Sequence, residues 1–235
     1  MKRILPFLII VAVLVIALGS VWYLTRPVAT SNGPTNTQPA ASTAQATPAQ
    51  APSQVRTGIP GAEPAHTHGP ANAPAHIEEF GDYQCPPCGM FHPILEQMEE
   101  EFGDKLRVTF RHFPLPNHQH ALRAASAAEA AGLQGKFWEM HKLIYEHQKD
   151  WKDLFDVRPV FDGYAKEIGL DVARFNRDIG SSQVQQRIVL DSKRGQSLGV
   201  SGTPTVFLNG REVPFQSLPA DTLRVLIQKE IDSKK

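Results

Sequence analysis

The chain has 235 residues, with 24 basic and 24 acidic side chains, and therefore no formal net charge at pH 7. This balance gives no argument for a nucleic acid or an anionic surface as partner, because both are bound through an excess of positive charge. The length is sufficient for one domain with a hydrophobic core, and the two cysteines of the chain are Cys85 and Cys88.

A predominantly apolar segment runs from Ile4 to Leu24, with basic residues before it and Arg26 after it. It is long enough to cross a hydrocarbon core of about 30 Å. We expect residues 1–26 to form a single-pass anchor in the cell (inner) membrane with a cytoplasmic N-terminus, which places the rest of the chain in a periplasmic or other extracytoplasmic space. A cleaved signal peptide is the alternative, because Ala17-Leu18-Gly19 offers a small-x-small site. Outside the cytoplasm, disulfides form and persist.

Residues 27–74 consist mainly of Pro, Ala, Thr, Gln, Ser and Gly, with almost no large apolar side chain. Such a segment cannot bury a core, so we expect a disordered linker between the anchor and the folded part. His66, His68 and His76 suggest metal capture, but histidines in a mobile segment are more often solvated. No metal site is predicted here.

Residues 75–235 are expected to form the folded domain, in the order β, α, β, a block of helices, then β, β, α. In Lys105–Phe113 apolar and polar residues alternate, which predicts a strand with one buried face. Asn209-Gly210 predicts a hairpin turn. The other expected strands are His76–Phe80, Thr205–Leu208 and Arg211–Val213, and the expected helices are Gly89–Phe102, Ala121–Ala131, Phe137–Tyr145, Val160–Ile168, Asp171–Ile179, Ser182–Leu198 and Pro219–Asp232.

Cys85 and Cys88 lie where the first strand meets the first helix. A cysteine at a helix N-terminus is stabilised as thiolate by unpaired N–H groups and the helix dipole. Pro86 suits the first helical turn, since its missing N–H has no intrahelical partner there. Cys88 lies one turn further on, so its sulfur can return to Cys85 and release a mixed disulfide. Cys85 is therefore the predicted nucleophile and Cys88 the predicted resolving thiol.

Two other interpretations of the cysteine pair remain. Half of a tetrahedral zinc site is one, but a structural zinc ion needs four ligands, there is no second cysteine pair, and His92 is the nearest imidazole. A purely structural disulfide is the other, although so short a loop constrains the unfolded chain little.

Four motifs resemble those of one family in the same order. They are Phe80-Gly81-Asp82-Tyr83-Gln84-Cys85-Pro86-Pro87-Cys88, Arg111-His112-Phe113-Pro114-Leu115, Phe137-Trp138-Glu139-Met140-His141 and Gly202-Thr203-Pro204-Thr205-Val206-Phe207. The sequence is similar over 75–235 to the DsbA-like thioredoxin-fold thiol–disulfide oxidoreductases, and would be a membrane-anchored member. The resemblance implies an α/β, thioredoxin-like fold with a helical insertion between its βαβ and ββα halves.

The resemblance also implies roles for further residues. Pro204 is expected to be cis and to lie beside Cys85, with the backbone of Thr203 pairing an extended substrate segment. Glu79 matches an acidic position beneath the dithiol, where a buried carboxyl could relay a proton to or from Cys88. In the alternative, Glu79 lies on the surface and Glu78 is the buried residue.

The predicted function is thiol–disulfide exchange with protein substrates outside the cytoplasm, in the direction of disulfide formation. It needs no cofactor, but it needs a redox partner that recycles the dithiol. Pro87 stands where the best-known oxidases of the family have histidine, which implies a higher thiol pKa and a less oxidising couple. The alternatives are a reductase or isomerase on the same scaffold, or a module that binds a soft metal.

Overall fold

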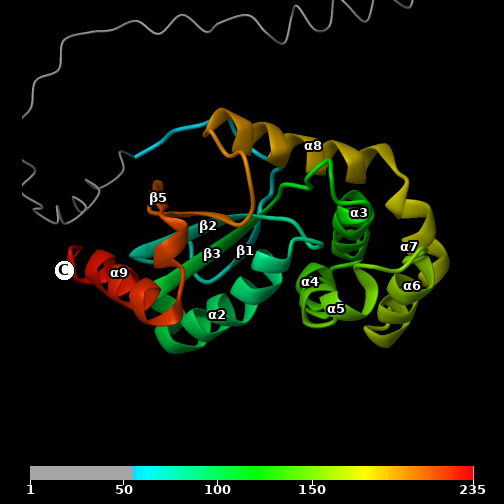
Figure 1. The fold of residues 1–235 in the computed structure, drawn as a ribbon, viewed down its shortest axis with the longest axis horizontal. Coiled ribbons are helices and arrows are strands. Elements are labelled where there is room, and N and C mark those ends of the chain that lie inside the picture. The colour runs from blue at the N-terminus through cyan, green and yellow to red at the C-terminus, as the bar shows by residue number, and fades with distance from the viewer. Residues whose placement is uncertain (1–54, 235) are drawn as a thin grey trace, which may run out of the picture. The chain divides into compact units, whose positions relative to one another are not determined.

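The computed structural model describes residues 55–234 (Figure 1). The predicted anchor, residues 1–26, and the linker residues up to 54 lie outside this part. Among the described residues, no helix combines the length and apolar character needed to cross a membrane.

A five-stranded sheet forms the centre of the domain, with strand order β1-β3-β2-β4-β5. The strands are β1 (His66–His68), β2 (Ala75–Gly81), β3 (Leu106–His112), β4 (Thr205–Leu208) and β5 (Arg211–Val213). β2 and β3 are parallel and joined through a helix, whereas the other neighbouring strands are antiparallel. The predicted βαβ and ββα halves are therefore both present, and they share one sheet through the β2–β4 pair.

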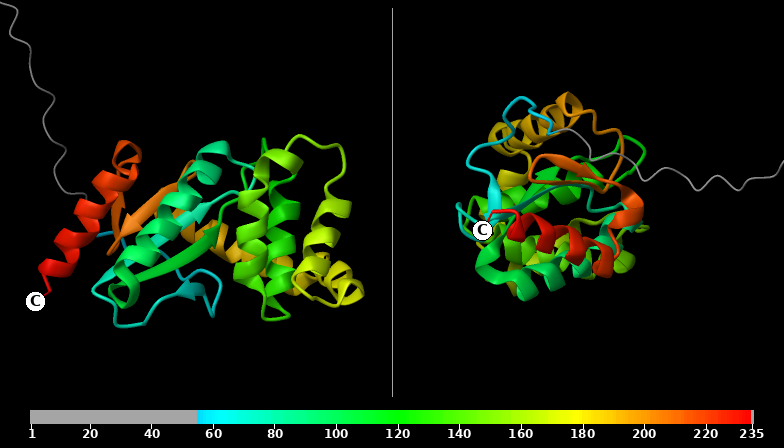
Figure 2. Two further views of the ribbon diagram at one scale, coloured as in Figure 1. Left: turned by 90° about the horizontal axis from the view of Figure 1, so that it is seen from below. Right: turned by 90° about the vertical axis from the view of Figure 1, so that its left-hand side faces the viewer.

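Helices cover both faces of the sheet (Figures 1 and 2). α2 (Pro86–Phe102) and α9 (Ala220–Asp232) pack on one face, and α8 (Ser182–Ser197) packs on the other. The short 3-10 helices η1 (Gly103–Lys105) and η2 (Phe215–Ser217) lie in the connections. Apolar side chains of α2 and α9, such as Met98 and Ile227, form one core cluster with those of β2, β3 and β4.

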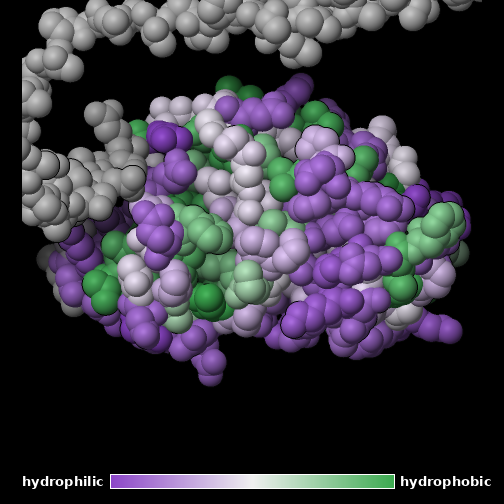
Figure 3. Space-filling model, viewed as in Figure 1, coloured by the Kyte–Doolittle hydropathy of each residue, from purple (hydrophilic) through white to green (hydrophobic). Residues whose placement is uncertain are grey.

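The predicted helical insertion lies between β3 and β4. Before α8 it contains α3 (Ala121–Gly132), α4 (Phe137–Glu146), α5 (Gln148–Trp151), α6 (Arg158–Glu167) and α7 (Val172–Ile179). Apart from the short α5, each of these helices was predicted from the sequence. Their apolar faces pack around Trp151, Phe161 and Phe175. Hydrophilic side chains gather over this part of the molecule in the view of Figure 3.

The β4–β5 hairpin has the predicted turn. Asn209 and Gly210 have φ angles of 47° and 77°, in the left-handed region that a two-residue hairpin turn requires and that Asn and Gly tolerate best. The Asn209 side chain also accepts a hydrogen bond from the backbone N–H of His76, 2.9 Å away. The turn is thus fixed to the start of β2.

The prediction of a disordered linker up to residue 74 is wrong for its last part. β1 lies within this segment and pairs with β3, His66 opposite Phe110. Further upstream, the N–H of Ala62 donates to Asp191, 2.8 Å away. The segment lacks large apolar residues, but main-chain hydrogen bonds and ring stacking hold it, as where His66 stacks on Phe137 with ring centroids 3.4 Å apart.

The prediction that β3 has one buried face is also wrong, because Thr109 and Arg111 are buried beneath α8. Arg111 donates to Glu78 at 2.9 Å, to Asp191 at 3.0 Å and to the carbonyl oxygen of Ala62 at 2.7 Å. A charged side chain is tolerated inside a protein when it is paired and hydrogen-bonded in this way.

Candidate active site

Cys85 is the N-cap residue of α2, directly after the turn that follows β2, and Pro86 is the first helical residue. Cys85 is 4% exposed and Cys88 is fully buried. The backbone N–H of Gly89 donates to the carbonyl oxygen of Cys85 at 3.1 Å, which closes the first turn of the helix. The predicted placement of both cysteines is confirmed.

Asp82 is a buried anchor for the loop that carries Cys85. Its carboxylate accepts hydrogen bonds from the N–H of Gln84 at 2.7 Å and of Leu115 at 2.8 Å, and pairs with His118 Nδ1 at 2.7 Å. These contacts hold the cysteine loop against the segment that follows β3. The sequence analysis assigned Asp82 no role, although it lies in the quoted Gly81-Asp82-Tyr83 motif.

Gln148 holds the same loop from the helical insertion. Its side-chain amide donates to the carbonyl oxygens of Tyr83 at 2.7 Å and of Cys85 at 2.9 Å. No sequence signal singled out Gln148, since it lies in a helical block 60 residues beyond the cysteines and its partners are main-chain atoms. The helical insertion thus covers the loop that carries Cys85 and also holds it in position.

The two thiols differ strongly in acidity. A hydrogen bond from the Cys88 thiol is the main reason that the pKa of Cys85 is lowered to about 6, and Thr203 acts in the same direction against the effect of burial. Burial raises the pKa of Cys88 well above its ordinary value, and its hydrogen bond to Cys85 adds to this. Near neutral pH the dithiol therefore carries its thiolate on Cys85.

The loop with Thr203 and Pro204 lies against Cys85, as expected. The peptide bond between the two residues is cis, and Cys85 Sγ lies 3.3 Å from the carbonyl oxygen of Thr203. Directly after Pro204, β4 begins and pairs with β2. The rigid sheet thus fixes both segments that meet at the reactive sulfur.

Glu79 and Glu78 are both buried, but on different faces of the sheet. Burial is the main reason that the pKa of Glu79 is raised to about 8, with Glu99 and Cys85 adding to the shift. Glu79 Oε1 has no hydrogen-bond partner among residues 55–234. Glu78 is likewise buried, which favours its neutral form, yet hydrogen bonds from Arg194 and Arg111 lower its pKa.

Among the residues that the structure describes, neither cysteine belongs to a cluster of potential metal ligands. Within residues 55–234, side-chain ligand atoms of three or more His, Cys, Asp or Glu residues converge at one place, formed by His66, His112 and Glu129. His92 instead contacts Glu96 at 3.7 Å and the rings of Tyr145 and His141. Among the described residues, none adds a ligand that would complete a zinc site at the cysteine pair.

The fold was compared with solved structures. Oxidised BdbD from Bacillus subtilis has a TM-score of 0.64 at 23% identity, covering 72% of this chain and 93% of that chain. The thiol-disulfide exchange protein alpha-DsbA2 from Wolbachia pipientis has a TM-score of 0.60 at 24% identity, with coverages of 70% and 86%. A thioredoxin-like oxidoreductase from Silicibacter pomeroyi has a TM-score of 0.56 at 25% identity, with coverages of 70% and 92%.

Curated relatives include sodium–proton antiporters. NhaA 1 of Mycolicibacterium vanbaalenii is 38% identical over 150 residues, which are 62% of this chain and 23% of the antiporter. NhaA 1 of Salinispora arenicola is 41% identical over 148 residues, with coverages of 62% and 22%. This chain thus matches less than a quarter of either antiporter.

Fold and site together define a thioredoxin-like fold with a helical insertion and a Cys-x-x-Cys pair at the start of α2. Residues 62–229 match the family model described as Thioredoxin, and the chain belongs to that family.

Proposed function

We propose that this protein forms disulfide bonds in protein substrates outside the cytoplasm. The observation that supports this best is the difference between the two thiols, because the pKa of Cys85 is lowered to about 6 while that of Cys88 is raised. A thiol of low pKa is a good leaving group, and its stable thiolate favours the reduced form of the enzyme. Both effects favour donation of the disulfide to a substrate.

The reaction starts from the Cys85–Cys88 disulfide. A substrate thiolate attacks the sulfur of Cys85, a substrate–Cys85 disulfide forms, and Cys88 leaves as a thiolate. A second substrate thiolate then attacks the substrate sulfur of the mixed disulfide, and Cys85 leaves. The substrate loses two electrons and the enzyme gains them as a dithiol, which a redox partner must oxidise again.

Thr203 and Pro204 are proposed to bind the substrate segment that carries the reacting thiol. Their loop lies beside Cys85, and an extended peptide could pair with the backbone of Thr203 as an added strand. Such pairing would use main-chain atoms, so it would accept many sequences. That suits an enzyme that acts on unrelated unfolded chains.

Glu79 is proposed to supply the proton that the departing Cys88 needs. Its carboxyl is buried with a pKa of about 8, so it is protonated at neutral pH, and Oε1 is free of hydrogen bonds. In this role, Glu79→Gln slows the release of Cys88 more than it slows the later attack that frees Cys85. Stopped-flow measurement of the two steps tests this, and an equal effect on both would remove the relay role.

Residues 1–26 are proposed to anchor the domain in the cell membrane with a cytoplasmic N-terminus. The support is the apolar run Ile4–Leu24 with its basic flank. Protease protection of tagged protein in sealed cells or spheroplasts checks this topology. If protease added outside the sealed spheroplasts does not digest the domain, the proposed topology is contradicted.

The direction of electron flow can be tested with a reduced, unfolded substrate that needs disulfides for activity. Stoichiometric oxidised enzyme should restore its activity, and Cys85→Ser should abolish the effect. A reductase or isomerase is the second candidate, because Pro87 stands between the cysteines instead of a histidine. A reductase or isomerase would rapidly reduce substrate disulfides in its dithiol form, and its disulfide form would oxidise the reduced substrate little.

A further inference from the structure

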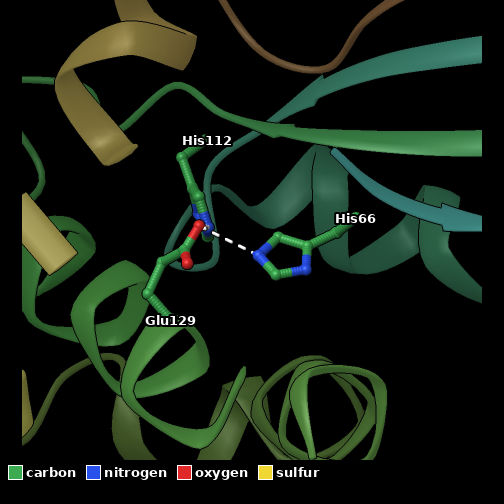
Figure 4. A group of neighbouring side chains, drawn as sticks. All are labelled: His66, His112 and Glu129. Atoms are coloured by element: carbon green, nitrogen blue, oxygen red, sulfur yellow. Dashed lines mark hydrogen bonds and ion pairs between the residues drawn. The ribbon is translucent and has the colours of Figure 1, made fainter. Parts of the chain in front are cut away.

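Side chains from three separate elements converge away from the cysteine pair. His66 lies in β1, His112 ends β3, and Glu129 lies in α3 (Figure 4). His66 Nε2 and His112 Nε2 each lie 3.0 Å from the same oxygen, Glu129 Oε1. The ligand atoms of all three residues lie within 4.8 Å of one another. Two imidazole nitrogens and one carboxylate oxygen thus face one point.

A proton cannot satisfy every contact of His66 Nε2. This atom lies 3.0 Å from Glu129 Oε1 and 3.2 Å from Arg187 Nη2. A proton on Nε2 suits the carboxylate but opposes the guanidinium N–H, whereas a lone pair suits the guanidinium but opposes the carboxylate. Arg187 does not need His66, because its other donors reach Glu129 Oε2 at 2.6 Å and the carbonyl oxygens of Glu63 and Pro64 at 3.3 and 2.9 Å.

We propose that His66, His112 and Glu129 bind a Zn²⁺ ion through His66 Nε2, His112 Nε2 and Glu129 Oε1. A cation at their meeting point would accept both imidazole lone pairs and the carboxylate oxygen, while Arg187 would keep its hydrogen bonds to the carbonyl oxygens of Glu63 and Pro64. Two histidines and one carboxylate are a zinc ligand set that leaves a fourth position open. The His66 side chain is 17% exposed whereas those of His112 and Glu129 are 1% exposed, so the open position and the path for the ion lie on the His66 side.

The donor atoms favour a transition metal over a hard cation. Calcium and magnesium take six or more oxygen ligands, whereas two of the three donors here are nitrogens. Arg187 binds the second oxygen of Glu129 and orients the carboxylate from outside the site. Its charge offsets that of Glu129, so the imidazoles carry most of the affinity.

The ion would connect the N-terminal strand to the rest of the domain. β1 is a three-residue edge strand, and the site joins it to β3 and to α3 of the helical insertion. The unfolded chain does not hold these three residues together, so zinc binds the native state in preference and raises the unfolding temperature.

The test uses the full-length oxidised protein in detergent, because the Cys85–Cys88 disulfide cannot then bind the metal. Isothermal titration with ZnCl₂ and thermal unfolding with and without ZnCl₂ are the two measurements. His66→Gln and His66→Phe each remove the His66 ligand. His66→Phe keeps an aromatic ring against Phe137 and serves as the second variant if His66→Gln does not fold. His68→Gln is the matched control, because His68 lies in the same strand and stacks on Trp138 as His66 stacks on Phe137.

The expected result is one Zn²⁺ per chain and a higher unfolding temperature with ZnCl₂. Loss of His66 should weaken binding by about 100-fold or more, since even partners outside the ligand shell contribute about 10- to 100-fold. His68→Gln should change the affinity by less than about twofold, as expected for a residue outside the site. The proposal is overturned if the oxidised protein binds no zinc, or if the His66 variants bind it as tightly as His68→Gln.

Discussion

Glu78 and Glu79 are consecutive residues of β2, and their carboxyl groups lie on opposite faces of the central sheet. Glu78 pairs with Arg111 and Arg194 beneath α8. Glu79 lies on the face covered by α2, where its Oε1 has no hydrogen-bond partner and its pKa is raised to about 8. One carboxylate therefore supports the fold, and the other is held protonated near the thiols.

The raised pKa of Glu79 predicts a pH-dependent loss of stability. Between 4.5, the ordinary pKa, and about 8, the native state binds more protons at this group than the unfolded state does. The stabilising contribution is thus full below pH 4.5 and is lost as the pH rises toward 8. From pH 5 to 7.5 the loss is about 3 kcal/mol, at 1.36 kcal/mol per pH unit.

Urea unfolding of Glu79→Gln at pH 5 and 7.5 checks this, because the amide does not titrate. Both proteins should carry Cys85→Ser and Cys88→Ser, which removes the opposing titration of the thiols. Relative to this parent, the variant should gain up to about 3 kcal/mol between the two pH values, because Cys85, which adds to the raised pKa of Glu79, is absent from both proteins. If the free energies of unfolding of parent and variant differ by the same amount at both pH values, burial does not shift the ionisation of Glu79.

Arg111→Met should be strongly destabilising, because it leaves Asp191 buried without its charged partner and removes one of the two arginines at Glu78. Breaking a buried ion pair in this way costs about 3–5 kcal/mol of unfolding free energy. Arg224→Met is the matched control, since Arg224 pairs with Glu101 at the surface, and it should leave the urea midpoint nearly unchanged. Equal urea midpoints for the two variants would contradict the account of this network.

Cys88→Ser should accumulate mixed disulfides between Cys85 and oxidised substrates, because Cys85 can still attack a substrate disulfide but no Cys88 thiol is present to attack Cys85 and release the substrate. Non-reducing gels of the variant in cells should show slow-migrating species that disappear with reductant. Cys85→Ser should show none, although it keeps the other cysteine. Comparable adducts on both variants would mean that the roles of the two sulfurs are not distinct.

The rate at which the reduced enzyme is alkylated should rise with the fraction of Cys85 that is thiolate. It should therefore reach half its maximum at about pH 6. The main cause is the hydrogen bond from Cys88, so Cys88→Ala should move the midpoint upward by about one pH unit or more, since hydrogen bonds to charged groups contribute about 1.5–3 kcal/mol. Cys88→Ser, which keeps an O–H donor, should shift it less. A midpoint that is the same in all three proteins would exclude Cys88 as the cause.

Most of the fold and the core of the site could be predicted from local patterns. The strand, Cys85, Pro86 and the helix after them are neighbours in sequence, and helical spacing identified the main insertion helices. The meeting of Thr203 with Cys85 was expected from the family resemblance, since periodicity does not show which loops come together.

What the sequence did not predict depends on contacts between distant segments. Arg111 looked like an exposed strand residue because its partners, Glu78 and Asp191, lie on other elements and α8 covers them. β1 was assigned to the linker because it is short and polar, and its partner strand lies about 40 residues away. His112 and Glu129 had no local signal that would join them to His66.

The proposed direction of electron flow requires that the stabilised thiolate of Cys85 makes the disulfide form an oxidant. The equilibrium reduction potential of the Cys85/Cys88 couple against glutathione tests it most directly. We predict a value clearly above that of thioredoxin, about −270 mV, but below the extreme of about −120 mV found in the strongest oxidant of this fold. A value at or below about −270 mV would contradict the proposed direction and would favour a reductase.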